Sequence, residues 1–248
     1  SKKDSLVGYW RNDGISSWTD RAPENMIFEA NTGTHITLDS DITLADNTAW
    51  SISYYFSHIS KTGFLAVMSI GRNDSVDINR NWIYHTGNNV NLALNDEGST
   101  QWALGYNPRD TGWHHLVISC DGAATAGFTC HLDGVSLGAG SATRANSEYH
   151  ITHLGLCYSS DYYSWNGYLS QICVWNSVLN TAQSLELYQL GLEEDILTHS
   201  LTANILNYWK GSGITDASWV DKKGSNDGTV AGSPDASGTN DGTPAGSP

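Results

Sequence analysis

The stretch Trp50-Ser51-Ile52-Ser53-Tyr54-Tyr55-Phe56 decides the fold class of this chain. Within it, large apolar side chains stand at every second position, with mostly serine between them. Successive side chains of a β-strand point to opposite faces, so this alternation predicts a strand with one apolar face over residues 49–57. Such a strand belongs to a sheet that packs this face against a core.

Short apolar runs separated by turn residues recur along the chain after this strand. The further predicted strands cover residues 63–70, 81–85, 90–94, 101–104, 113–120, 127–132, 135–137, 150–157 and 167–175. Turn signals such as Gly87-Asn88-Asn89 and Asp133-Gly134 lie between them. This spacing predicts an all-β protein, an antiparallel β-sandwich of the jelly-roll type.

One short helix is expected near residues 180–190. Asn180 offers an N-terminal cap, and Gly191 would end the helix. Ala182, Leu185, Tyr188 and Leu190 form the expected apolar stripe. We expect this helix to lie as a lid over one edge of the sandwich.

The charge of the chain limits its partners. The 248 residues carry a formal net charge of −14. Such a surface repels phosphate groups, so we expect neither nucleic-acid binding nor insertion into a membrane. No apolar run approaches the length that spans a bilayer. We expect an extracellular or virion-surface location, reached after removal of a signal peptide or through virion assembly.

The four cysteines, Cys120, Cys130, Cys157 and Cys173, lie in strand-like runs. They form no CxxC pair, which excludes a zinc ribbon and a thioredoxin-like site. Cys120 and Cys130 flank a predicted hairpin turn, and the count permits two disulfides, Cys120–Cys130 and Cys157–Cys173. Buried thiols are the preferred interpretation.

An aromatic segment near the N-terminus recurs near the C-terminus. Tyr9-Trp10 recurs as Tyr208-Trp209, Trp18 as Trp219, and Asp20-Arg21 as Asp221-Lys222. We interpret the second copy as a closing strand that lies near the first copy or reaches a neighbouring subunit. The predicted organisation is a jelly roll over residues 1–205, a closing segment over 206–224 and a repetitive Gly/Ser/Asn/Asp-rich tail over 225–248.

The order of the motifs resembles that of laminin-G-like, concanavalin-A-like jelly rolls. Residues 112–122, Gly-Trp-His-His-Leu-Val-Ile-Ser-Cys-Asp-Gly, resemble the family's "W-H-H-V-A-V-T-Y-D-G". Residues 50–56 resemble "W-T-I-E-F-W", and residues 166–176 resemble "F-N-G-Y-I-D-E-V-R-I-W-N". The resemblance covers roughly residues 6–192 and implies the jelly-roll fold, although a fold alone does not imply a function.

Two details qualify what the resemblance implies. The acidic pair of the family's "D-E-V" is Ser170-Gln171 here, so a calcium site that depends on that pair is not carried over. Tyr208-Trp209-Lys210, followed by Asp221 and Ser225-Asn226-Asp227-Gly228-Thr229, resembles the terminal segment of laminin-G-like proteins of marine phages. This second resemblance implies a virion structural or adhesion protein.

The catalytic patterns of enzymes with this fold are missing. Retaining glucanases need E-x-D-x-E, which places two glutamates on one face of a strand, and no two glutamates of this chain have that spacing on a predicted strand. Polysaccharide lyases use Q-I-H, where this chain has Gln171-Ile172-Cys173. By strand parity, His150 and His153 point to opposite faces and would not share a metal ion. We therefore expect no enzyme.

A loop rich in aromatic residues is the candidate binding site, because rings stack on sugar faces and polar groups bind hydroxyls. Its candidate ligand-binding residues, with three from other predicted strands that would extend the surface if they neighbour the loop, are Tyr158, Asp161, Tyr162, Tyr163, Trp165, Trp82, Tyr84 and Trp102. Contact with a glycan and contact with another protein fit this loop equally well. Asp74, Asp77 and Asn79 are candidate calcium ligands, with a solvated turn as the competing interpretation.

These observations favour a non-catalytic recognition module that binds a glycan or a cell-surface receptor. The alternative is a building block of a viral capsid, a tail or an extracellular filament. In that alternative, the chain forms a homo-oligomer through the aromatic residues of the duplicated segments, Tyr9, Trp10, Trp18, Tyr208, Trp209 and Trp219. A polysaccharide-cleaving enzyme is the least favoured hypothesis.

Overall fold

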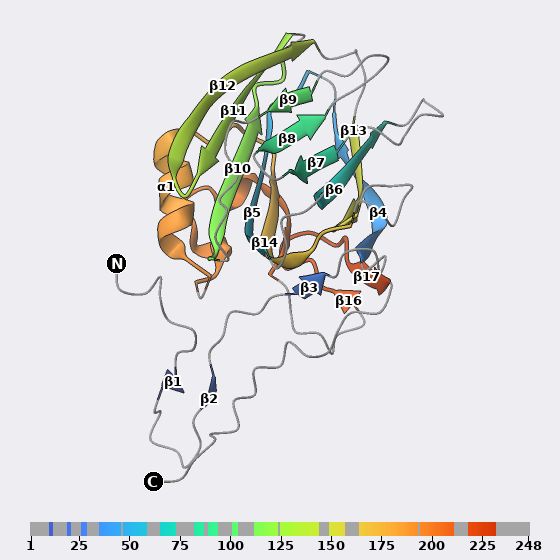
Figure 1. Ribbon diagram of the computed structural model, residues 1–248, viewed down its shortest axis with the longest axis vertical. Helices are drawn as coiled ribbons and strands as arrows, with labels where there is room; N and C mark the ends of the chain where they lie inside the picture. Colours follow the sequence, from blue (N-terminus) through green and yellow to red (C-terminus); the bar gives the residue numbers. More distant parts are fainter. Residues whose placement is uncertain are drawn as a thin grey trace.

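Two antiparallel sheets form the body of the molecule (Figure 1). The computed structural model describes residues 10–11, 19–20, 26–28, 35–45, 47–58, 65–72, 82–86, 89–93, 101–103, 112–123, 125–143, 149–156, 164–192, 194–210 and 218–231. Within these residues the first sheet has the order β12-β11-β10-β5-β14-β15, with β3 also paired to β14. The second sheet has the order β16-β17-β4-β13-β6-β7-β8-β9.

The strands of both sheets are short, and most lie where the sequence predicts them. Those of the first sheet are β3 (Met26–Phe28), β5 (Trp50–His58), β10 (His114–Cys120), β11 (Thr125–Leu132), β12 (Val135–Thr143), β14 (Gly167–Trp175) and β15 (Ile205–Trp209). Those of the second sheet are β4 (His35–Leu44), β6 (Leu65–Arg72), β7 (Trp82–His85), β8 (Val90–Ala93), β9 (Gln101–Ala103), β13 (Tyr149–Leu154), β16 (Ser218–Trp219) and β17 (Gly228–Ala231). A separate two-stranded sheet joins β1 (Trp10–Arg11) to β2 (Thr19–Asp20).

The apolar face of β5 lies between the two sheets, as its alternation predicts. Trp50, Ile52, Tyr54 and Phe56 are each at most 1% exposed and belong to a core cluster that includes residues of the second sheet. Burial of such large side chains is the main favourable term in folding. The predicted all-β sandwich is therefore confirmed.

The serines of β5 lie on its other face, which α1 and its flanking segments cover. Ser51 Oγ donates to the carbonyl of Ser177 at 2.6 Å, and Ser53 Oγ accepts from Trp175 Nε1 at 3.0 Å. Tyr55 OH donates to the carbonyl of Leu187, in the helix, at 2.9 Å. These bonds satisfy polar groups that the helix and its flanking segments bury against the sheet.

The helix α1 (Thr181–Leu190) covers the side of the first sheet that faces away from the second (Figure 1). It begins at Asn180, which forms a capping box with Gln183, and it ends at Gly191, as predicted. The expected apolar stripe is wrong, because Leu187 is buried whereas Leu185 is 40% exposed. The buried side depends on the sheet below, where Leu187 joins a cluster with Val117, Cys173 and Trp175. No described helix has the length and apolar character needed to cross a membrane.

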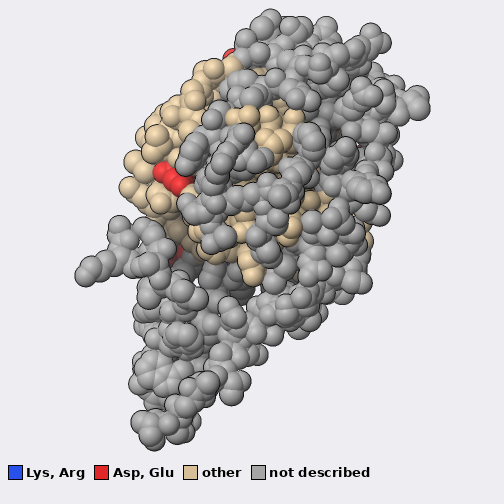
Figure 2. Space-filling view, viewed as in Figure 1, with Lys and Arg blue, Asp and Glu red and all other residues tan. Residues whose placement is uncertain are grey.

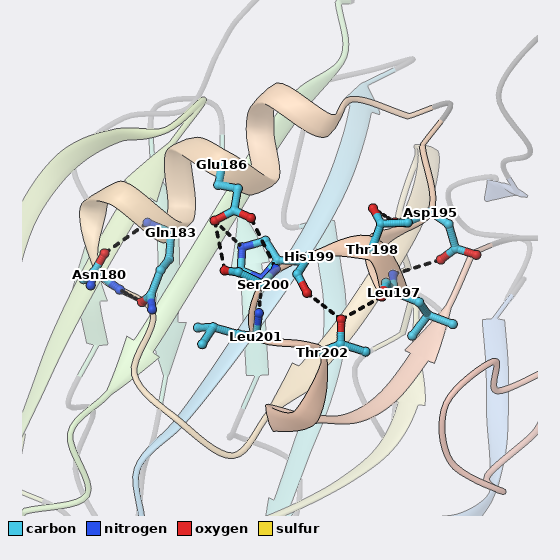
Figure 3. A network of polar contacts seen from close by, with 10 residues as sticks. All are labelled: Asn180, Gln183, Glu186, Asp195, Leu197, Thr198, His199, Ser200, Leu201 and Thr202. Atoms are coloured by element: carbon cyan, nitrogen blue, oxygen red, sulfur yellow. Dashed lines mark hydrogen bonds and ion pairs between the residues drawn. The ribbon is translucent and has the colours of Figure 1, made fainter.

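A polar network fastens the chain that follows α1 (Figure 3). The Glu186 carboxylate accepts from Ser200 Oγ at 3.1 Å, and its Oε2 lies 3.4 Å from His199 Nε2. His199 Nδ1 accepts the backbone N–H of Leu201 at 3.0 Å. The network holds the turns η4 (Ile196–Thr198) and η5 (Thr202–Asn204) against the helix.

Strand β14 bulges at Gln171, where its ladder with β5 shifts register. Gln171 has a positive φ of 46°, which is rare for a residue with a side chain. Its Nε2 donates to the carbonyls of Gly191, Leu192 and Glu194 at 3.1, 2.8 and 3.0 Å. The bulge therefore ties the end of α1 to the sheet.

Three of the four cysteines lie within the described residues. Cys120, Cys130 and Cys173 are reduced and buried, which agrees with the preferred interpretation, while Cys157 lies outside the described residues. Burial raises the pKa of the Cys130 thiol to about 12 and also raises that of Cys173. Neither of these two thiols is therefore a ready nucleophile at neutral pH.

The C-terminal copy of the aromatic segment belongs to the sandwich. Tyr208 and Trp209 are 0% exposed and Trp219 is 2% exposed, so in this structure they pack inside their own chain rather than against a neighbouring subunit. Gly228–Ala231, which the sequence places in the tail, form β17 and pair with β4. Of the N-terminal copy, Trp10 lies in β1, while Tyr9 and Trp18 lie outside the described residues.

Candidate functional site

Strand β4 separates an apolar face from a polar one. Its core-facing residues are Ile36, Leu38, Ile42 and Leu44. The residues between them are polar, and those near the two ends are His35, Thr37, Asp41 and Thr43. Side chains alternate along a strand, so these polar groups lie on the outer face of the second sheet, away from α1.

A β-bulge in β13 adds two histidines to this outer face. The ladders of β13 with β4 and with β6 both shift register between Ile151 and His153. His150 pairs with Thr43, and His153 pairs with Thr37, so both histidines follow the polar positions of β4. The expectation that His150 and His153 face opposite sides is therefore wrong, because the extra residue of a bulge changes the parity.

We call His35, Thr37, Thr43, His150 and His153 the polar strip. The rings of His35 and His153 have centroids 5.5 Å apart, and His153 Nδ1 lies 2.8 Å from Thr152 Oγ1. At the other end, His150 Nδ1 lies 3.4 Å from Thr43 Oγ1 and 3.9 Å from the exposed carboxylate of Asp41.

His153 of the polar strip is held in its uncharged form at neutral pH. Burial, and then the neighbouring His35, lower the pKa of His153, while Asp41 raises it. Neutral imidazoles and hydroxyls each donate and accept hydrogen bonds. Such a surface suits a ligand whose own groups both donate and accept, as sugar hydroxyls do.

The described residues contain no group of three or more His, Cys, Asp or Glu side chains placed to hold a metal ion. The candidate calcium ligands Asp74, Asp77 and Asn79 lie outside the described residues, so the calcium site stays a prediction.

The predicted aromatic surface is wrong for two of its residues. Trp165 is 0% exposed and Tyr84 is 1% exposed, so neither ring is available to stack on a ligand. Trp82 lies in β7 and Trp102 in β9. The loop residues of the prediction, Tyr158, Asp161, Tyr162 and Tyr163, lie outside the described residues.

Trp165 instead anchors the stem of that loop in the core. Its ring lies 4.9 Å from those of His58 and His85 and 6.0 Å from that of Phe56, measured between centroids. His85 Nε2 lies 2.9 Å from Tyr54 OH, and His85 Nδ1 lies 3.3 Å from His58 Nε2, so these three side chains contact one another inside the sandwich. A large aromatic ring there fixes the end of the loop through packing.

The two ends of the loop meet at the end of β13. Leu156 and Ser164 form an isolated bridge, and Trp165 N–H donates to the carbonyl of Gly155 at 2.8 Å. Leu154, two residues before this stem, pairs with Ile36, the neighbour of His35. The loop therefore leaves the sheet at the end of the polar strip that holds His35 and His153.

The Glu186, His199 and Ser200 group is not arranged for nucleophilic catalysis. The hydroxyl of Ser200 donates to Glu186, and the Nδ1 atom of His199 accepts a backbone N–H. A serine nucleophile needs its hydroxyl on the histidine. In the view of Figure 2 the described surface shows only small acidic patches and no Lys or Arg.

The chain belongs to the concanavalin A-like lectin/glucanases superfamily, whose laminin G-type family model matches residues 30–183. The laminin-G-like resemblance is thereby confirmed. The superfamily contains both binding proteins and enzymes, so membership does not decide between them.

Solved structures share the fold at low sequence identity. A putative carbohydrate-binding protein from Bacteroides ovatus has a TM-score of 0.60 and 12% identity, over 86% of this chain and 60% of that chain. A heptameric SAP-like pentraxin from Limulus polyphemus has a TM-score of 0.54 and 13% identity, over 67% of this chain and 82% of that chain. A comparison with curated protein sequences gives no match.

Sequence reasoning missed β4 and therefore missed three of the five residues of the polar strip. The signal was present, because Ile36, Leu38, Ile42 and Leu44 occupy alternate positions. The contribution of β13 was not readable in this way, since the bulge depends on how the strand pairs with its neighbours.

Proposed function

We propose that this protein is a non-catalytic carbohydrate-binding module whose ligand lies on the polar strip. The observation that carries the proposal is the outer face of β4 and β13, where imidazoles and hydroxyls lie side by side over an apolar core. The lectin-like family and the carbohydrate-binding description of the Bacteroides ovatus structure support it.

The aromatic loop supplies the second part of the proposed site. Its stem emerges next to the His35 end of the strip, so a sugar on the strip lies within reach of the loop. We propose that Tyr162 and Tyr163 provide stacking faces, whereas Trp165 keeps the stem in place. Stacking and hydrogen bonding together are the usual way to bind a polar ring.

Glycan-array screening followed by titration calorimetry tests this proposal. We expect His153→Ala combined with Thr37→Ala to weaken binding of the best ligand at least tenfold, because several hydrogen bonds of ~1 kcal/mol each are lost. Gln189→Ala, on the exposed side of α1, is the matched control and should bind as the parent does. Equal affinity of the double variant and the control would remove the strip from the proposal.

A separate variant tests the loop. Tyr162→Ala with Tyr163→Ala, with Trp165 left intact, should weaken binding without lowering the melting temperature. A loss of affinity that appears only together with a lower melting temperature would assign these tyrosines to packing instead.

Within this proposal, we place the module on an extracellular assembly or a virion, where its partner is a glycan of a cell surface. The acidic character of the chain, its net charge being −14, fits a partner that carries little negative charge. Assembly into a homo-oligomer and a bound calcium ion stay predictions.

A further inference from the structure

Three buried histidines lie where the first sheet meets α1 and the turns η4 and η5, which together we call the strap. His115 of β10, His131 of β11 and His199 of the strap are each at most 3% exposed. His131 Nε2 lies 3.0 Å from Oγ1 of Thr181, the first residue of α1. The ring of His115 lies against that of Tyr55, whose hydroxyl donates to two carbonyls of α1. Imidazoles from three segments therefore meet at one interface.

Burial controls the charge of these imidazoles. It lowers the pKa of all three, to about 3 for His115. Among the described residues, the groups that face them from neighbouring elements are Glu186 of α1 (Figure 3), Asp133 between β11 and β12, and Tyr55 of β5. Asp133 raises the pKa of His115, and Glu186 raises that of His199, yet burial outweighs both carboxylates. The docked strap therefore holds neutral imidazoles at pH 7.

Protonation of the docked form would leave buried N–H groups without acceptors. Both ring nitrogens of His115 and Nδ1 of His131 have no hydrogen-bond partner among the described residues. An imidazolium carries two N–H donors, and a buried donor without an acceptor is costly. Water accepts these hydrogen bonds once the strap lifts. Protonation and docking therefore oppose each other.

The apolar contacts of the strap are separate from the main core. Leu187 and Ile196 of the strap pack with Val117, Cys173 and Trp175 on the outer side of the first sheet. The cluster between the two sheets contains none of these residues. Segments with their own small contact cluster open locally at a lower free energy than the whole domain. The strap is therefore able to lift while the main core stays packed.

Both ends of the strap are fixed in the first sheet. The strands before and after it, β14 and β15, pair with each other. The Asp221 carboxylate holds β15 in place, because it accepts from the backbone N–H groups of Tyr208, Lys223, Gly224 and Asn226 at 2.8–3.1 Å. Although burial opposes it, these hydrogen bonds lower the pKa of Asp221, so this anchor stays ionised in mild acid.

We propose that the strap is an acid-sensitive cover, docked on the first sheet at neutral pH and released from it in mild acid while the sandwich stays folded. Protonated histidines favour the released form, because water there solvates their charge. The polar strip lies on the second sheet, so this device is separate from the proposed ligand site.

The size of the effect follows from His115. Its pKa is about 3 with the strap docked and returns toward 6.5 when the ring is solvated, so lowering the pH from 7 to 5 raises the released population about 20-fold. His131 and His199 act in the same direction, since burial lowers the pKa of both.

The reduced thiols report the release in the unmodified chain. Cys173 belongs to the cluster that the strap covers, whereas Cys120 and Cys130 belong to the main core. Labelling with a pyridyl disulfide, which reacts with thiols in mild acid, is followed for each cysteine by peptide mass spectrometry. With rates normalised to glutathione at each pH, we expect labelling of Cys173 to rise at least about 20-fold from pH 7 to pH 5. Cys120 and Cys130 should stay protected at both pH values.

Two variants separate protonation from a general loosening of the strap. His115→Leu removes the main titrating group and should cut the acid-induced rise severalfold. Gln171→Gly removes three hydrogen bonds to the end of α1, changes no titratable group and suits the positive φ at this position. It should raise the labelling of Cys173 by the same factor at pH 7 and pH 5. Gln189→Ala, on the exposed side of α1, is the control and should follow the parent.

Three results would overturn the proposal. The first is a Cys173 labelling rate in the parent that does not change between pH 7 and pH 5. The second is labelling of Cys120 and Cys130 that rises in parallel with Cys173, since acid would then unfold the whole sandwich. The third is an equal rise in His115→Leu and the parent. If His115→Leu does not fold, the three thiols of the parent decide alone.

Discussion

Replacing His115 with leucine should remove much of the acid sensitivity of this protein. His115 is 1% exposed, its ring lies 4.5 Å from that of Tyr55, and neither ring nitrogen has a hydrogen-bond partner among the described residues. Burial lowers its pKa from 6.5 to about 3, while Asp133 raises it and His199 lowers it further. The folded protein therefore keeps this imidazole neutral where the unfolded chain protonates it.

The sign of the effect follows from proton counting. Between pH 6.5 and about 3 the unfolded state binds more protons at this site, so the free energy of unfolding falls as the pH falls. Integrating the difference from pH 7 to pH 5 gives a loss of about 2 kcal/mol from this one residue. At pH 7 the leucine variant should be at least as stable as the parent, because two buried unpaired nitrogens disappear.

Urea unfolding at pH 7 and pH 5, followed by tryptophan fluorescence, measures the effect. The parent should lose about 2 kcal/mol more than His115→Leu between the two pH values. Because the other histidines are common to both proteins, their contributions cancel in this difference. Equal losses in parent and variant would show that His115 is protonated in the folded state or solvated, and the reasoning would fail.

Three further changes have definite expected outcomes. Asp221→Ala should lower the free energy of unfolding by about 3 kcal/mol in urea melts, because several buried N–H groups lose their acceptor. Gly167→Ala should prevent stable folding, since its φ is 151° and an added Cβ would collide with the Ser57 carbonyl. Gly138→Ala is the control, because its φ is 115° but the space around it is open, and it should lower the melting temperature far less. Trp165→Ala should cost about 3–5 kcal/mol in the same urea melts through the cavity it leaves, and an unchanged midpoint would contradict its role as an anchor.

The sandwich was predictable because its strands carry strong local signals. The alternation over residues 49–57 indicates which face of the strand is buried, and the turn residues mark where the later strands end. These strands were therefore found. The ends of α1 were found for a similar reason, because Asn180 and Gly191 act within one turn of the chain. The buried side of α1 was not found, because it is set by the sheet that Leu187 meets.

The candidate site was less predictable because it depends on pairing between strands. The bulge that aligns His150 with His153 exists only in the ladders with β4 and β6. Trp165 looked like a binding residue because it ends an aromatic run, yet its backbone begins a strand-like stem that turns the ring inward. The sequence indicates that a large apolar ring such as Trp165 will be buried against something. Only the fold shows whether it is buried in a ligand site or in the core.

The bulge at Gln171 makes the end of α1 sensitive to a single substitution. Three carbonyl oxygens converge on one amide nitrogen. Backbone carbonyl oxygens arranged in this way are also ligands of hard cations such as calcium. Gln171→Glu would place a carboxylate among those carbonyls, and the oxygen-only cluster would then need a positive charge from solution to stay together. With the amide nitrogen of Gln171, the end of α1 is held by hydrogen bonds within the chain. With a carboxylate oxygen in place of that nitrogen, its stability would depend on a bound cation.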